Sequence, residues 1–148
     1  MALLGSVYAL LPSLAVVGFL AFTVWQLMQA DRSPRARPDP QLWLFPAALS
    51  LLFAGWSFHA VVAGGRDGFW TEHVRNAWGN QIWFDLLLAI AISWTLILPR
   101  ARALKMQAGW WLLFIICTGC VGLLAMLARC LFLETRAPGS ASGPTRLP

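Results

Sequence analysis

Charged residues are scarce in this chain of 148 residues, where Asp, Glu, Lys and Arg together make up 11%. A soluble globular domain carries about 25% charged residues, so the composition argues against an ordinary water-soluble domain. Tyrosine occurs once and histidine twice, whereas tryptophan occurs nine times and hydrophobic residues make up 59%. Because no long polar region remains for a second, soluble domain, we expect one all-α membrane protein.

The chain also lacks the motifs of a soluble-cofactor enzyme: it has no phosphate-binding loop, no haem motif and no Ser-His-Asp order. Cys117 and Cys120 are spaced C-x-x-C, but no second cysteine pair or histidine pair completes a metal site. We therefore expect no metal and no cofactor. The net charge of +5 comes from arginines between apolar runs, which fits lipid headgroups better than nucleic acid, so no nucleic-acid partner is expected.

Four apolar runs are long enough to cross a bilayer as α-helices, which rise about 1.5 Å per residue. They cover about residues 3–28, 42–63, 80–98 and 109–133, and form one predicted domain over residues 1–136. We expect these four transmembrane helices to pack as an antiparallel bundle and residues 137–148 to be a disordered tail. The first run has no Lys or Arg before Arg32 and is long, so we interpret it as a retained helix rather than a secretory signal.

Basic residues gather in two of the three connectors. These are Arg32, Arg35 and Arg37 after the first helix, and Arg100, Arg102 and Lys105 after the third. An even number of spans puts both connectors on one side, and the positive-inside rule makes that side the cytoplasm. We therefore predict a multi-pass protein of the bacterial inner membrane with its N- and C-termini outside the cytoplasm. Its expected partner is the lipid bilayer, and association with other membrane subunits is left open.

The connector over residues 64–79 mixes polar and aromatic residues. The candidates that we single out in and just after it are Trp70, His73, Asn76, Trp78 and Asn80. A short amphipathic helix over about residues 70–77 is expected to lie on the membrane surface, with Thr71 as its N-cap. We expect Phe69, Trp70 and Trp78 to anchor this connector over the outer ends of the second and third helices.

Three ionisable side chains fall inside the predicted spans at similar depth. His59 lies about 7 Å below the outer end of its helix, Asp85 about 6 Å and Arg129 about 7 Å. Gln81 precedes Asp85 by one turn, which completes a predicted polar layer of four residues. Charges inside a membrane are costly and tend to pair, so we expect an Asp85–Arg129 ion pair with His59 nearby. Alternatively, Arg129 extends to the headgroups and the layer is purely structural.

The stretch from Asn76 to Leu87 reads N-x-W-G-x-Q-x-W-x-D-L-L, and is followed by P-R-A-R-A and later by G-C-V-G-L-L-A-M-L-A-R. This pattern resembles a bacterial family of small, uncharacterised integral membrane proteins, a domain of unknown function loosely linked to membrane terpenoid cyclases. The resemblance covers residues 69–134 and implies a membrane fold without an assigned substrate. Cys120 stands where that family often has serine, which implies that a hydroxyl is not essential there.

Two functions of different classes follow from these patterns. The first is a small inner-membrane protein with a structural, accessory or assembly role, because tryptophans and small-residue faces suit helix association. The alternative is a membrane-embedded enzyme acting on an isoprenoid or lipid substrate, with Asp85 as acid and His59 and Arg129 as further catalytic candidates. A ligand-sized cavity beside Asp85 would favour the enzyme. A carrier or channel is disfavoured because the sequence indicates no inverted repeat, broken helix or ring of charges.

Overall fold

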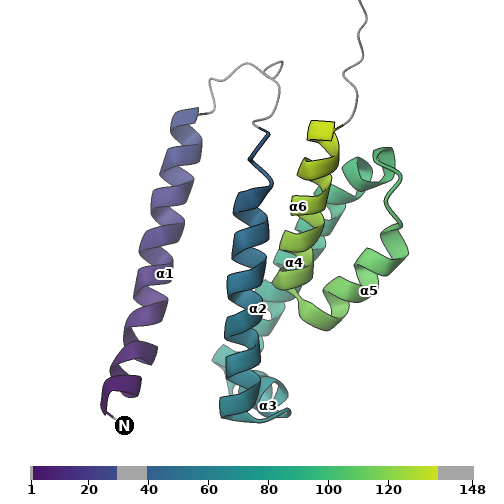
Figure 1. Cartoon of the computed structure of the whole chain (residues 1–148). Helices are drawn as coiled ribbons and strands as arrows, with labels where there is room; N and C mark the ends of the chain where they lie inside the picture. The colour runs from purple at the N-terminus through teal and green to yellow at the C-terminus, as the bar shows by residue number, and fades with distance from the viewer. Residues whose placement is uncertain (1, 30–39, 137–148) are drawn as a thin grey trace, which may run out of the picture. The chain divides into compact units, whose positions relative to one another are not determined.

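The computed structural model describes residues 2–29 and 40–136, which form six α-helices and no strand (Figure 1). α1 (Ala2–Gln29) belongs to one compact unit. The second unit contains α2 (Leu44–Gly64), α3 (Gly68–Val74), α4 (Ala77–Ala103), α5 (Ala108–Thr118) and α6 (Cys120–Arg136). The all-α class is therefore correct. The predicted tail over residues 137–148 and the arginines from Arg32 to Arg37 lie outside the described residues.

Two helices, α2 and α4, are long and apolar enough to cross a membrane. In each, only 6% of the most apolar window is buried inside the protein. Two of the four predicted transmembrane helices are therefore candidate membrane spans by length and composition. α1 runs for 28 residues and continues through Pro12, against the predicted range of 3–28.

α4 is longer than the predicted range of 80–98 at both ends. Pro99 does not end the helix. Its missing backbone N–H removes one hydrogen bond, but the next turn is intact, since the Leu104 N–H donates to the Arg100 carbonyl at 3.0 Å. Arg100 and Arg102 lie in the last turn, where positive charge interacts favourably with the C-terminal end of a helix. At the other end Asn76 caps the helix, since its side chain accepts the Gly79 N–H at 2.9 Å.

The fourth predicted span is broken at Gly119, so the prediction of one helix over residues 109–133 is wrong. Gly119 has φ +59°, a left-handed conformation that side chains with a Cβ rarely adopt. The chain then folds back and α6 packs against α5. A Cβ on Gly122 would lie 3.0 Å from the Cα of Ile115, so this crossing needs a glycine. Two glycines three residues apart thus convert one apolar run into a helical hairpin.

α6 runs antiparallel to α2 but in the same direction as α4. The Trp43 ring, just before α2, lies 5.2 Å from the Phe132 ring near the end of α6, whereas Ser50 Oγ donates to the Val121 carbonyl at 2.9 Å in the first turn of α6. Arg100, in the last turn of α4, pairs with Glu134 in the last turn of α6. The predicted antiparallel bundle, which put the ends of the third and last spans on opposite sides, is therefore wrong.

The second unit thus has two different ends (Figure 1). We call the end where α2 begins and α4 and α6 finish the basic end, and the opposite end, where α3 contacts α2 and α4, the α3 end. The buried core lies toward the basic end and consists of Ile97, Ala101, Ile115, Met126 and Cys130. Elsewhere α2 and α4 leave most of their apolar side chains exposed.

Candidate functional site

The structure divides the predicted polar layer between the two ends. His59 lies five residues before the end of α2, and Asp85 eight residues after the start of α4, so both lie toward the α3 end. Arg129 lies toward the basic end, where its neighbour Phe132 contacts Trp43. Between Trp43 and His59 the helix advances about 24 Å. The predicted Asp85–Arg129 pair is therefore wrong, because the break at Gly119 turns α6 back toward the basic end.

Asp85 interacts with its own helix instead. Its Oδ1 accepts a hydrogen bond from Gln81 Nε2 at 3.1 Å, one turn earlier on α4, and its side chain is exposed. The His59 ring is exposed as well and lies 5.4 Å from the Trp56 ring on α2. Neither residue lines the pocket described below. The Gln81–Asp85 contact is thus the part of the predicted layer that the structure brings together.

The outer connector forms a tight corner between α3 and α4. Asn80 Nδ2 donates to the His73 carbonyl at 3.0 Å and to the Asn76 carbonyl at 3.2 Å, which ties the two helices together. A Cβ on Gly79 would overlap the carbonyl oxygen of Glu72, so the backbones can approach this closely only at a glycine. Three residues of the N-x-W-G-N stretch, Asn76, Gly79 and Asn80, therefore have a structural role here.

Aromatic packing in this corner centres on Trp83, which the sequence did not single out. The ring of Phe69 lies 5.1 Å from Trp83, and the ring of His73 lies 5.0 Å from it, both edge-on. Of the three predicted anchors Phe69 thus contacts α4, whereas Trp70 and Trp78 are 60% and 77% exposed and do not pack over the ends of α2 and α4 as predicted. Thr71 lies inside α3 and donates to the Asp67 carbonyl at 2.9 Å, so it is not the N-cap.

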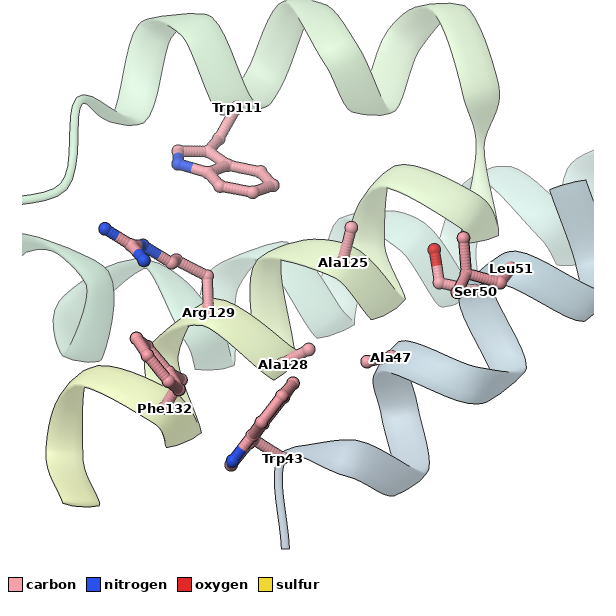
Figure 2. A pocket seen from close by; sticks show the side chains of 9 residues that line it. All are labelled: Trp43, Ala47, Ser50, Leu51, Trp111, Ala125, Ala128, Arg129 and Phe132. Atoms are coloured by element: carbon pink, nitrogen blue, oxygen red, sulfur yellow. The ribbon is translucent and has the colours of Figure 1, made fainter. Parts of the chain in front are cut away.

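A pocket of about 460 Å³ lies near the basic end between α2, α5 and α6 (Figure 2). It is lined by Trp43, Ala47, Ser50, Leu51, Trp111, Ala125, Ala128, Arg129 and Phe132. Arg129 is the one ionisable residue of this set. The Ser50 hydroxyl already donates to the Val121 carbonyl, so the interior offers mainly apolar surface. Figure 2 shows the guanidinium of Arg129 at one side of the pocket, between the rings of Trp111 and Phe132.

Two arginines share the Phe132 ring at this end. The guanidinium carbon of Arg129 lies 5.6 Å from the ring centroid and that of Arg136 lies 4.2 Å from it. The described residues form two ion pairs with each other, Arg75–Glu72 at 3.0 Å and Arg100–Glu134 at 2.7 Å, and neither includes Arg129 or Arg136. Positive charge therefore borders an apolar pocket. The sequence pointed to Arg129 but missed Trp43, Trp111 and Phe132, whose meeting depends on the hairpin at Gly119.

The three cysteines lie in different surroundings, and none forms a disulfide. Cys117 is exposed at the end of α5, whereas Cys130 is fully buried with its Sγ 3.6 Å from the Met106 Sδ. Within residues 2–29 and 40–136 no three histidine, cysteine or acidic side chains come together as metal ligands would. Cys117 and Cys120 are separated by the break between the two helices.

Comparison of the chain with protein-family models, with curated proteins and with solved structures finds no match. The resemblance to a family of small membrane proteins therefore stays a prediction.

Proposed function

We propose that this chain is a small multi-pass protein of the bacterial inner membrane with a structural or accessory role. In this role it associates with other membrane helices through the exposed apolar faces of α2 and α4. The observation that supports this is that both span-length helices have only 6% of their apolar windows buried. Contiguous apolar surface of this kind is rare on a soluble monomer, whereas in a bilayer it faces lipid or a neighbouring helix at little cost.

The exposed residues follow both helices over most of their length. On α2 they include Leu51, Leu52, Phe58 and Val62, and on α4 Ile82, Leu88, Ile92 and Leu96. No charged residue interrupts α2 between Leu44 and Gly64, and Asp85 is the one acidic residue of α4. Both surfaces therefore suit the hydrocarbon core of a membrane.

For the orientation we propose that the basic end faces the cytoplasm. Among the described residues, five basic ones lie toward it against one acidic residue, Glu134; the basic ones are Arg100, Arg102, Lys105, Arg129 and Arg136. At the α3 end, by contrast, Arg66 and Arg75 are matched by Asp67 and Glu72. This orientation puts Arg136 on the cytoplasmic side and replaces the predicted outside position of the C-terminus. The proposed outside position of the N-terminus follows, as before, from the arginines after α1.

Membrane insertion and orientation can be tested together in a cysteine-free background. We expect the protein to stay in the membrane pellet during carbonate extraction. In intact spheroplasts a membrane-impermeant maleimide should label Arg66→Cys, whereas Ser140→Cys should react only after lysis. Extraction by carbonate would contradict the membrane location, and labelling of Ser140→Cys in intact spheroplasts would contradict the orientation.

Association with other helices is tested separately by photo-crosslinking from the membrane. A photoreactive residue in place of Phe58, which is 72% exposed on α2, should crosslink to another protein. The matched control is the same residue in place of Met126, which is fully buried and should crosslink only within the chain. If the photoreactive residue at position 58 crosslinks to lipid alone, the accessory role is wrong even though the membrane location holds.

The enzyme that acts on an isoprenoid or lipid, with Asp85 as acid, stays a prediction. The pocket near the basic end does not include Asp85 or His59, so no observation favours this alternative. The break at Gly119 bears on the third possibility, because discontinuous helices are a feature of carriers. It removes one reason for disfavouring a carrier but supplies no substrate site.

A further inference from the structure

We propose that the pocket near the basic end binds one anionic phospholipid of the cytoplasmic leaflet, with an acyl chain in the space between α2, α5 and α6 and the phosphate on Arg129. This inference rests on the membrane location and orientation proposed above. It assigns a ligand to a site that the sequence did not identify.

The walls of the pocket suit an acyl chain. Ala47 on α2 lies opposite Ala128 on α6, whereas Ala125 on α6 points toward α5 (Figure 2). These small side chains leave room for a chain in the space that α2, α5 and α6 enclose. Trp43 and Trp111 border the space, and tryptophan is enriched where hydrocarbon meets the headgroup layer. The volume of about 460 Å³ falls within the range of about 300–1,000 Å³ usual for small-ligand pockets.

The charge at the rim suits a phosphate. Arg129 makes no ion pair with the described residues, and the nearby Glu134 is already engaged by both Nε and Nη2 of Arg100. A guanidinium presents several N–H donors in one plane and binds phosphate oxygens in a bidentate way. Arg136 on the same Phe132 ring adds a second positive charge to the same side. These two positive charges therefore interact more favourably with a headgroup of net negative charge than with a zwitterionic headgroup.

Another helix is the competing occupant of this apolar surface. The remaining long helix of the chain, α1, carries no acidic residue between Ala2 and Gln29, so it cannot neutralise Arg129. A phospholipid supplies both parts at once, an apolar chain for the pocket and an anion for its rim. This difference in charge complementarity favours the lipid.

Native mass spectrometry of the full chain in neutral detergent measures the preference directly. Phosphatidylglycerol should bind more tightly than phosphatidylcholine with the same acyl chains. Arg129→Gln should weaken phosphatidylglycerol binding about fivefold, the effect of one basic residue on an anionic lipid, and weaken phosphatidylcholine binding less, because the choline already offsets the charge of its phosphate. The matched control is Arg102→Gln, an exposed arginine near the same end that does not line the pocket, and it should weaken phosphatidylglycerol binding clearly less than Arg129→Gln does. Equal losses in the two variants would mean a diffuse charge effect and would overturn the site.

Two further measurements identify the ligand. Ala125→Trp fills the pocket and should weaken both lipids, with circular dichroism and the Tm in phosphatidylcholine showing that the variant is folded. Unchanged phosphatidylglycerol binding in folded Ala125→Trp would show that the acyl chain does not lie in the pocket and would overturn the proposal. Inorganic phosphate should not compete with the lipid, and if it does, the site binds an anion without an acyl chain. Carbonate extraction remains the separate test of membrane location, so the two proposals can fail independently.

Discussion

Arg100 and Glu134, which are 34 residues apart in sequence, form a two-pronged ion pair between the last turns of α4 and α6. Arg100 Nη2 lies 2.7 Å from Glu134 Oε2, and Arg100 Nε donates to Oε1 at 3.0 Å. This contact and the Ser50–Val121 hydrogen bond show which way α6 points in the unit. The same arrangement brings Arg129 next to Phe132 and Trp111 rather than next to Asp85.

The ion pair should contribute measurably to stability. Its side chains are 45% and 27% exposed, so solvent screening limits Arg100→Gln or Glu134→Gln to a loss of about 0.5–1 kcal/mol each. The double variant should lose less than the sum, because neither change then leaves a charge without its partner. Unfolding by SDS titration in mixed micelles measures this, with Arg102→Gln as the control. Additive losses would show that the two residues do not interact.

Substitution by alanine should lower the stability of the protein at Gly122 and raise it at Gly55. In Gly122→Ala the new Cβ would meet Thr118 Oγ1 at 2.8 Å and the Ile115 Cα at 3.0 Å, so α5 and α6 must separate. We expect the free energy of unfolding to fall by about 1–3 kcal/mol. Gly55 lies in α2, where a Cβ would have no neighbouring atom within 4 Å, so Gly55→Ala should gain about 0.5–1 kcal/mol. Equal effects in SDS titration would mean that the hairpin at Gly119 does not form.

Gly79→Ala should loosen the corner between α3 and α4. The added Cβ would lie 2.9 Å from the His73 carbonyl oxygen as well as overlapping that of Glu72, and both are backbone atoms that cannot rotate away. Hydrogen exchange over residues 68–80 should become faster, whereas exchange in α6 should not change. Gly68→Ala is the control, because a Cβ there would have nothing within 4 Å. Slow exchange in Gly79→Ala would show that the corner does not close as described.

Lys105→Gly should stabilise the end of α4. Lys105 has φ 56°, and the Met106 N–H donates to the Ala101 carbonyl at 2.9 Å, the hydrogen bond of a helix that ends in a Schellman turn. Glycine adopts this φ without the cost that a Cβ imposes, so we expect a gain of about 0.5–1 kcal/mol. Ala91→Gly, in the interior of α4, should instead lower the free energy of unfolding by about 1 kcal/mol. A loss at position 105 in SDS titration would contradict the turn.

The limits of sequence reasoning are clearest for the polar layer. Matched depths for His59, Asp85 and Arg129 hold only if residues 109–133 form one straight helix. Glycine is frequent in membrane helices, so the local sequence around Gly119 and Gly122 is compatible with a continuous apolar helix. Once the helix folds back at Gly119, Arg129 moves to the opposite end from Asp85 and the depth comparison no longer holds.

Local chemistry determined the parts of the structure that depend on neighbours in sequence. Uninterrupted apolar stretches made the helices, Gly64 and Gly65 ended α2, and basic residues gathered outside the apolar runs. Tertiary structure alone decided the direction of α6, the close approach at Gly79 and the pocket beside Arg129. Each of these depends on contacts between residues that are 7 to 89 positions apart in sequence, as from Glu72 to Gly79 or from Trp43 to Phe132. Such contacts follow from packing, which no periodicity along a single helix encodes.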